Sequence, residues 1–276
     1  MAANRCDCAR RLSGRRWRRA ISRRTPRRRN SRGSRRCAGD GRVTLRVAIT
    51  RALPDAQRTA ERVRAIGAEP IVAPLLTITP CAYDTKVGDA QALLFTSANG
   101  VRAFPDARGN HATPVLAVGD ATAEAARAAG FTNVRSADGD SAALARMAKT
   151  TLAPNAGKLV HIGGEHVAGD VASELRAAGF EVERRIAYAA IAAATLPAAF
   201  GEPLDVVLFH SARAAETFVA LGAPNADKFT AACMSEAVAE AARKVRWARI
   251  IVSPAPREDA LLRAALAPDS PAGASA

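Results

Sequence analysis

Hydrophobic and polar positions alternate in a regular way from residue 45 to about residue 266. Short apolar runs that suit buried strands are followed by a small polar loop and then by an alanine-rich stretch with helical spacing of its apolar positions. This alternation predicts parallel sheets covered by helices. The predicted strands lie near residues 45–50, 69–73, 91–96, 114–118, 132–135, 158–162, 181–187, 205–209, 229–233 and 249–252.

Two segments interrupt this rhythm, at residues 74–90 and at RIAYAAIAAATLP (185–197). Two strands before the first segment and three after the second equal the five between them. We therefore predict an α/β fold with two similar open parallel-sheet domains of flavodoxin-like or Rossmann-like type, one inserted in the other through a two-stranded hinge. The predicted parts are a disordered Arg-rich leader (1–43), a discontinuous domain (44–75 plus 192–267), an inserted domain (76–191) and a disordered tail (268–276).

A weak internal repeat supports a duplicated fold. LLFTSANGVRAF (93–104) resembles VLFHSARAAETF (207–218), and AVGDATAEAAR (117–127) resembles CMSEAVAEAAR (233–243). Alanine-rich helices resemble one another by composition alone, but the same order of both matches is harder to explain that way.

The strongly basic charge belongs to one end of the chain. Residues 1–42 hold 16 of the 40 Lys and Arg and two of the 26 acidic residues, so 24 basic and 24 acidic residues remain for the rest. The leader has few apolar residues and many like charges, which predicts disorder. An RNA-binding or targeting arm is the alternative for this segment, since such arms attract phosphate. We expect no nucleic-acid partner.

Membrane and metal signals are absent from the sequence. No apolar run approaches the roughly 20 residues of a membrane span, and no secretory signal is present, so we expect a cytoplasmic protein without a membrane partner. Three of the five cysteines, Cys6, Cys8 and Cys37, lie in the leader at spacings that match no common zinc pattern. We expect no metal and no disulfide framework. Without a sustained heptad, we expect a monomer.

Candidate ligand-binding residues follow the predicted strands, because ligands of open parallel sheets bind where loops lead into helix N-termini. Glycines and small hydroxyl residues dominate these loops, and the backbone amides they expose favour anions. The serines among them have an alternative role as helix N-caps, and one serine can serve both roles. The candidates are Thr50, Arg51, Ser97, Ala98, Asn99, Gly119, Thr122, Gly164, Glu165, Ser211, Ala212, Arg213, Ser235 and Glu236.

Candidates for acid–base chemistry are few. No Ser-His-Asp arrangement, HExxH motif or nucleotide-binding loop is visible, so we expect no cofactor. His161 and His210 end predicted strands, where a structural role is the commoner one. Tyr188, one of two tyrosines, lies in the second interrupting segment and is a candidate proton donor; packing of the hinge is the alternative.

Five runs resemble, in the same order, the uroporphyrinogen-III synthase family over about residues 45–266. They are LFTSANGVRAF, LAVGDATAEAARAAGF, VHIGGEHVAGDVASELRAAGFEVERRIAYAA, VVLFHSARAAETF and FTAACMSEAVAEAA. The resemblance implies two domains joined by a β-ladder, with hydroxymethylbilane and its eight carboxylates in the cleft and no cofactor. It implies a hydro-lyase of haem, sirohaem and cobalamin biosynthesis that releases water and closes the ring with ring D inverted, through a spiro intermediate.

The resemblance also implies roles for single residues. Tyr188 matches the family's linker tyrosine, and Thr122 matches a threonine at a helix start. Ser211 matches the first serine of a Ser-Pro-Ser segment that reads Ser211-Ala212-Arg213 here, and Val238 replaces the equivalent threonine of the other domain. The main alternative function is a non-enzymatic two-domain binding protein for an anionic small molecule, which would bind without turnover.

Overall fold

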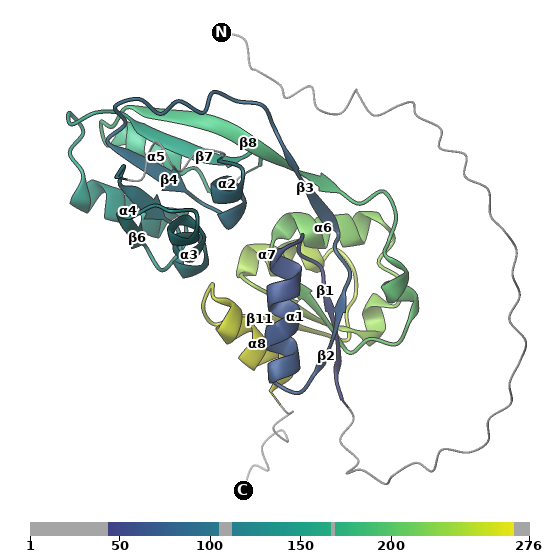
Figure 1. Cartoon of the computed structure of the whole chain (residues 1–276). Coiled ribbons are helices and arrows are strands. Elements are labelled where there is room, and N and C mark those ends of the chain that lie inside the picture. The colour runs from purple at the N-terminus through teal and green to yellow at the C-terminus, as the bar shows by residue number, and fades with distance from the viewer. Residues whose placement is uncertain (1–43, 105–111, 167–168, 268–276) are drawn as a thin grey trace, which may run out of the picture. The chain divides into compact units, whose positions relative to one another are not determined.

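The structure of the chain is a computed structural model that describes residues 44–104, 112–166 and 169–267. The predicted leader and tail, with the three leader cysteines, lie outside the described residues. The described residues form an α/β protein with two separate sheets (Figure 1).

The first sheet has five parallel strands in the order β11-β10-β9-β1-β2. Strands from both ends of the described chain meet in it, since β1 pairs with both β2 and β9. Its strands are β1 (Arg46–Ile49), β2 (Glu69–Val72), β9 (Val206–Phe209), β10 (Thr230–Cys233) and β11 (Arg249–Val252).

The second sheet has six strands in the order β3-β8-β7-β4-β5-β6. All neighbours are parallel except β3 and β8, which are antiparallel. Its strands are β3 (Leu76–Pro80), β4 (Ala92–Phe95), β5 (Val115–Ala117), β6 (Val134–Ser136), β7 (Leu159–Gly164) and β8 (Val182–Ala192).

Helices cover both faces of each sheet, as the alternating pattern predicts. Buried side chains of α1 and α8 pack on one face of the first sheet and those of α6 and α7 on the other. On the second sheet, α2 and α3 share one face and α4 and α5 the other. The helices are α1 (Asp55–Ala65), α2 (Ala98–Arg102), α3 (Asp120–Ala128), α4 (Ser141–Thr151), α5 (Val171–Ala177), α6 (Ala212–Ala220), α7 (Glu236–Ala242) and α8 (Glu258–Leu266), with short 3-10 helices η2 (Ala198–Gly201) and η3 (Ala226–Lys228).

Helix α1 shows how the sequence sets these elements. Asp55 lies in its first turn and Arg62 and Arg64 in its last, which complements the helix dipole. Gly67 follows with φ of +89°, a left-handed conformation that favours glycine and ends the helix.

The two sheets share one strand order, which explains the internal repeat. The order β6-β5-β4-β7-β8 in the second sheet corresponds to β11-β10-β9-β1-β2 in the first. The first half of the repeat falls on β4–α2 and β9–α6, and the second half on β5–α3 and β10–α7. Strand order therefore reverses direction between β4 and β7 and between β9 and β1. Such switch points are where open parallel sheets bind ligands.

Two sequence predictions need correction. The second sheet has six strands rather than five, because β3 lies within the interrupting segment 74–90. The segment 185–197 does not end the strand near residue 187, since β8 continues to Ala192. Both changes have one cause: Leu76–Pro80 pairs antiparallel with the last five residues of β8, which satisfies the backbone groups of both crossing segments. The ladder is the predicted two-stranded hinge, whereas the domain boundaries themselves stay a prediction.

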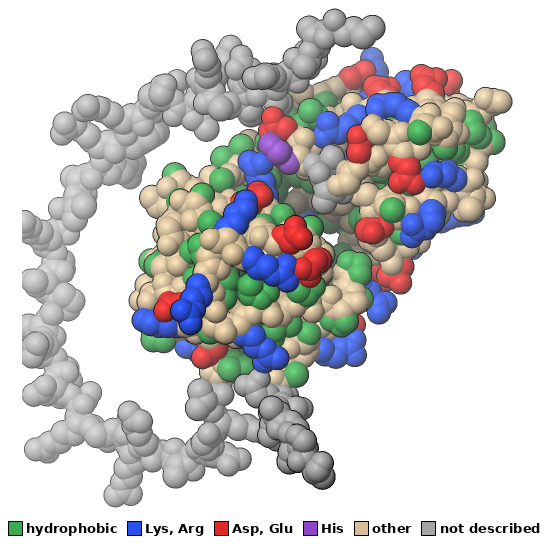
Figure 2. All heavy atoms as spheres, turned by 180° about the vertical axis from the view of Figure 1, so that it is seen from behind, with side chains coloured by type: hydrophobic (Ala, Val, Ile, Leu, Met, Phe, Trp, Pro, Cys, Tyr) green, Lys and Arg blue, Asp and Glu red, His purple; other side chains and the backbone are tan. Residues whose placement is uncertain are grey.

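Charges of both signs are interspersed over the face of the described residues that Figure 2 shows. This agrees with the equal numbers of basic and acidic residues that follow residue 42. Within the part of the chain that the structure describes, every helix is too short or too polar to span a membrane.

Candidate active site

Tyr188 lies in β8, next to the switch point of the second sheet. It pairs with Gly164 of β7 and with Pro80 of β3. The register between β7 and β8 shifts at Gly163 and Gly164, an irregularity of the kind that re-aims side chains. A Cβ atom at Gly164 would lie 2.8 Å from two ring atoms of Tyr188, so the absence of a side chain there makes room for the ring. The structure thus brings two predicted site residues into contact.

The phenol of Tyr188 is buried and stays protonated at neutral pH. The residue is only 8% exposed, and burial raises the pKa of the phenol above its usual value. A hydrogen bond with Ser97 and the charge of Arg102 offset part of this rise in pKa, and Asp55 adds to it. At neutral pH the phenol is therefore protonated and able to donate.

The loop after β4 carries three more predicted site residues. Ser97 is the N-cap of α2, and its hydroxyl oxygen accepts a hydrogen bond from the Asn99 amide at 3.1 Å. Ala98 begins the helix, and the side chain of Asn99 accepts a hydrogen bond from Arg102 at the helix end. Ser97 therefore has the capping role, whereas its role in binding a ligand stays a prediction.

The loop after β7 is held by backbone contacts. The Glu165 amide donates to the carbonyl of Tyr188 at 2.9 Å. The guanidinium of Arg184 donates to the carbonyls of Gly164 and Glu165, at 2.8 Å and 2.9 Å. These bonds fix the chain beside the Tyr188 ring, although the sequence did not single out Arg184.

The loops at the switch point of the first sheet are held in the same manner. Thr50 is fully buried, and its hydroxyl donates to the carbonyl of Leu208 at 2.7 Å, which ties the end of β1 to β9. Ser211 caps α6, since its oxygen accepts from the Ala214 amide at 3.3 Å, and Ala212 begins that helix. The hydroxyl of Thr50 thus has a structural role, because its proton is donated to the Leu208 carbonyl.

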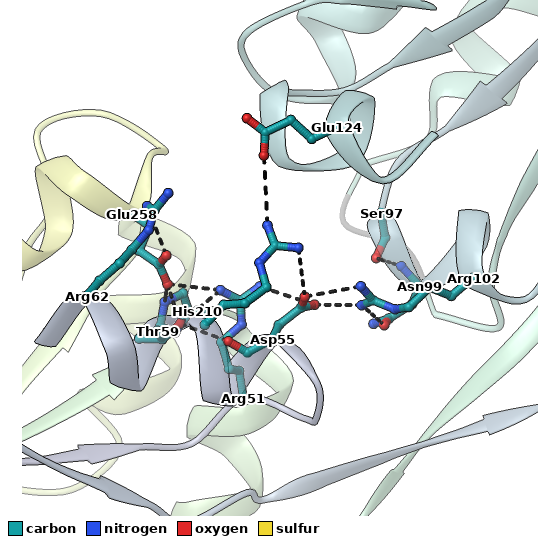
Figure 3. Close-up of polar contacts among 11 residues, drawn as sticks. Arg51, Asp55, Thr59, Arg62, Ser97, Asn99, Arg102, Glu124, His210 and Glu258 are labelled. Carbon is teal, nitrogen blue, oxygen red and sulfur yellow. Dashed lines mark hydrogen bonds and ion pairs between the residues drawn. The ribbon is translucent and has the colours of Figure 1, made fainter. Parts of the chain in front are cut away.

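The carboxylate of Glu258, which has several charged and polar partners, lies beside this switch point (Figure 3). Glu258, the first residue of α8, contacts Arg51 at 3.0 Å, Arg62 at 3.1 Å and the ring of His210 at 3.2 Å, and it accepts a hydrogen bond from Thr59. Burial alone would raise the pKa of Glu258, but the bonds from His210 and Thr59 and the nearby Arg51 lower it to about 2. Burial lowers the pKa of His210, so its ring is neutral and donates through Nε2.

Contacts also join α1, which covers the first sheet, to α2 and α3, which cover the second (Figure 3). The guanidinium of Arg102 on α2 binds both carboxylate oxygens of Asp55 on α1, at 3.2 Å and 2.7 Å. Arg58 on α1 lies 4.0 Å from Glu124 on α3. Sequence reasoning missed all four residues. Asp55 in a first turn and Arg102 in a last turn are ordinary complements of the helix dipole, and Arg58 and Glu124 lie on different helices that are far apart in the sequence.

Four other site positions lie at the starts of α3 and α7. Gly119 and Ser235 are the N-caps of these helices, both without a side-chain cap bond. Thr122 and Val238 are the third residues of α3 and α7, and both are buried. The match of Val238 to Thr122 thus holds in three dimensions, and Val238 packs in the hydrophobic core of its sheet.

Glu236 and Arg213 have contacts away from Tyr188. Glu236 forms an ion pair with Arg243 on its own helix. Arg213 lines a shallow hollow with Glu216 and Thr217 next to the end of β8. Its Nε atom is buried and has no hydrogen-bond partner within the residues described.

His161 lies in β7, and its Nε2 is hydrogen-bonded to Thr96 at 3.2 Å. Burial, assisted by the charge of Arg184, lowers the pKa of His161 to about 4. The ring is neutral at physiological pH, which agrees with the structural role expected for it. Among the described residues, no group of three His, Cys, Asp or Glu side chains is placed to hold a metal ion.

Two open α/β sheets, with polar loops at both switch points and a buried tyrosine on the β3–β8 ladder, are typical of an α/β protein that binds a ligand at its strand ends. A family model described as uroporphyrinogen-III synthase HemD matches residues 57–263. The chain belongs to this uroporphyrinogen-III synthase family, and it is an enzyme of tetrapyrrole synthesis that acts on a tetrapyrrole substrate. The match favours this function over that of a non-enzymatic binding protein.

One solved structure supports the fold. The chain is similar to the uroporphyrinogen-III synthetase of Helicobacter pylori 26695, with 12% identity, a TM-score of 0.53, and coverage of 80% of this chain and 97% of that one. A variant of uroporphyrinogen III synthase from the extremely thermophilic bacterium Thermus thermophilus shows 18% identity, a TM-score of 0.48, and coverage of 80% and 96%. A comparison with curated protein sequences found no match.

Proposed function

We propose that the chain acts as a hydro-lyase that converts hydroxymethylbilane to uroporphyrinogen III. The C–O bond of the ring-A hydroxymethyl group breaks, the oxygen leaves as water, and an azafulvene-type cation remains. Ring D attacks through its substituted carbon and forms a spiro intermediate, which fragments and recloses with ring D inverted. The proton lost from ring D at the end balances the proton given to the leaving oxygen.

Tyr188 is the proposed donor of that proton. One observation supports this role most directly: its phenol is buried on β8 against Gly164, beside the switch point of the second sheet, and keeps its proton at neutral pH. A group that stays protonated at neutral pH can assist the departure of hydroxide as water. The residues that surround the ring have the positioning task, because Gly164 leaves space for it and Arg184 holds the loop.

The substrate's eight carboxylates are the proposed ligands of the loops at strand ends. Backbone amides at the starts of α2, α3, α6 and α7 supply partial positive charge for anions. The linear substrate closes without enzyme to the non-inverted isomer, so the enzyme must favour a compact conformation in which the inverting path is faster. This is catalysis by positioning and by differential binding of the transition state.

The proposed functional unit is a cytoplasmic monomer with a discontinuous domain (44–75 plus 192–267) and an inserted domain (76–191). The two separate sheets, of which only the second contains the β3–β8 ladder, support this division. No cofactor is required by the proposed chemistry. Size-exclusion chromatography with light scattering tests the monomer, since a dimeric mass would contradict it.

The test of function is the isomer ratio of uroporphyrin that forms, after oxidation, from freshly generated hydroxymethylbilane with the full chain. We expect mainly isomer III, against isomer I in a reaction without enzyme. Isomer I at the uncatalysed rate from folded protein would overturn the proposal.

A further inference from the structure

Asp55, the first residue of α1, is surrounded by arginine side chains (Figure 3). Arg102 binds both of its carboxylate oxygens, Arg51 lies 3.5 Å away and Arg58 lies 4.0 Å away. The side chain of Asp55 is 13% exposed, and that of Arg102 is 31% exposed. Three guanidinium groups thus converge on one carboxylate that solvent still reaches.

Positive charge is in excess in this cluster. Four arginines, which are Arg51, Arg58, Arg62 and Arg102, meet three carboxylates, which are Asp55, Glu124 and Glu258. His210 adds no charge, because burial keeps its ring neutral. The cluster can therefore accept one further negative charge without a net excess of anions.

The cluster also lies within reach of the proposed proton donor. Arg102 ends α2, and this helix packs against β7 and against β8, the strand that carries Tyr188. The charges of Arg102 and Asp55 act on the Tyr188 phenol in opposite directions, so both are electrostatic neighbours of that group. A substrate carboxylate near the reacting end of the tetrapyrrole would meet these arginines.

We propose that Arg102 and Arg51 form a receptor for one carboxylate of the linear tetrapyrrole, and that Asp55 fills this receptor in the free enzyme as an internal competitor. The inference rests on the proposed function. A planar guanidinium binds the carboxylate of an aspartate and that of an acetate or propionate side chain with the same two-point geometry. Asp55 can release Arg102 because Arg58 remains beside it and the N-terminus of α1 favours its negative charge.

A structural brace between α1 and α2 is the competing explanation, and substitutions separate the two. Asp55→Asn removes the competing charge, whereas Arg102→Gln removes the receptor. An internal competitor predicts opposite changes in substrate affinity for these variants. A brace predicts changes in the same direction, because both variants break the same ion pair.

The experiment uses the full chain and measures KM for hydroxymethylbilane, together with Kd for uroporphyrin III, an octacarboxylate that binds without turnover, by porphyrin fluorescence. We expect Arg102→Gln to raise both constants about tenfold, the value of one charged contact, and Arg102→Lys to restore part of the loss. We expect Asp55→Asn to lower both constants about threefold. The matched control is Arg64→Gln, which removes an exposed positive charge from the same helix and leaves both constants within about twofold.

Each outcome has one meaning. Opposite shifts for Asp55→Asn and Arg102→Gln support the receptor, and shifts in one direction, or no shift, overturn it. Thermal unfolding of each variant shows whether it is folded, and Arg102→Lys replaces Arg102→Gln if the latter is not. A wild-type chain that forms only isomer I would refute the proposed function instead, and the isomer ratio reports that separately from the affinities.

Discussion

At the scale of single residues, the phenol of Tyr188 is a proton source whose loss should affect the chemical step. We expect Tyr188→Phe to lower kcat for isomer III about 100-fold, the usual contribution of a general acid, with little change in KM. Single-turnover formation of uroporphyrinogen III measures this. The matched control is Tyr83→Phe, since the Tyr83 hydroxyl is bonded to the carbonyl of Ala103 at 3.0 Å, outside the site. Equal rates for Tyr188→Phe and wild type would exclude the phenol as donor.

Substitution of Gly164 should also lower the rate, because this residue touches the ring of Tyr188. Its Cβ would lie 2.8 Å from the Tyr188 ring, so we expect Gly164→Ala to displace the ring and lower kcat for isomer III at least tenfold. Gly201→Ala is the control, because a Cβ there meets no atom within 4 Å. Kinetics and thermal unfolding of both variants check the prediction. A Gly164→Ala enzyme with normal kcat would show that the ring position does not matter.

The sequence allowed single residues to be predicted where their hydrogen bonds join positions close together in the chain. Ser97 and Ser211 were predicted as both caps and site residues, and their capping bonds span only two or three positions. Asp55, Arg102 and Glu258 were missed, because their partners come from other parts of the chain. Arg102 is 47 positions from Asp55, and Arg51 is 207 positions from Glu258. Such contacts depend on the tertiary fold. In the sequence alone, each of these residues looks like an ordinary charged surface residue.

At the scale of elements, Glu258 ties α8 to α1 and to the loop after β9. Its folded-state pKa of about 2 lies below the usual 4.5, so its charged form stabilises the fold. That stability is fully present above about pH 5 and is lost as pH falls toward 2. We expect Glu258→Gln to lower the free energy of unfolding by about 2 kcal/mol at pH 7, and the difference from wild type to shrink below pH 4.

Urea unfolding at several pH values measures this difference. The control is Glu174→Gln on α5, whose carboxylate forms an exposed pair with Lys149 at 2.7 Å. An exposed pair contributes about 0.5 kcal/mol, so the control should show only a small change. A Glu258→Gln protein whose deficit is unchanged from pH 7 to pH 3 would contradict the assignment of the stability to the carboxylate charge.

Most elements follow from the hydrophobic pattern, and the exceptions have a common reason. The strands of both parallel sheets lie within a few residues of their predicted positions, because each is a short buried run. The β3–β8 ladder was harder to predict in detail. LTITP of β3 ends in a proline, and the second half of β8 is alanine-rich, which is weak strand composition. Pairing between these two segments, rather than local preference, makes them strands.

At the scale of the whole molecule, the fold class was predictable because strand and helix patterns alternate along the chain, and the strands outside the two interruptions matched in number those predicted between them. The shared strand order of the two sheets then places both switch points without any knowledge of side chains. The approach of Arg102 to Asp55 could not be derived in this way. It depends on how the helices around one sheet meet those around the other, which no periodicity in the sequence specifies.

The uneven charge of the chain leads to the last prediction. Residues 1–42 carry the whole formal excess of +14, whereas the rest has equal numbers of acidic and basic residues. The family match begins only at residue 57, and the described elements of both switch points lie beyond residue 43. We therefore expect a chain of residues 44–276 to form isomer III with kcat/KM within about twofold of the full chain at 0.15 M salt, where charges beyond about 8 Å are screened.

Binding of polyanions should respond in the opposite way. A segment with 16 arginines attracts phosphate or sulfate polymers through counterion release, so the full chain should be retained on heparin and elute only at high salt. The chain of residues 44–276, which is neutral overall, should elute near physiological salt. Loss of isomer III in the shortened chain, measured with folded protein, would instead assign the arginine-rich segment to the reaction. Retention of both activity and heparin binding would show that the body carries a basic surface of its own, despite its balanced charge.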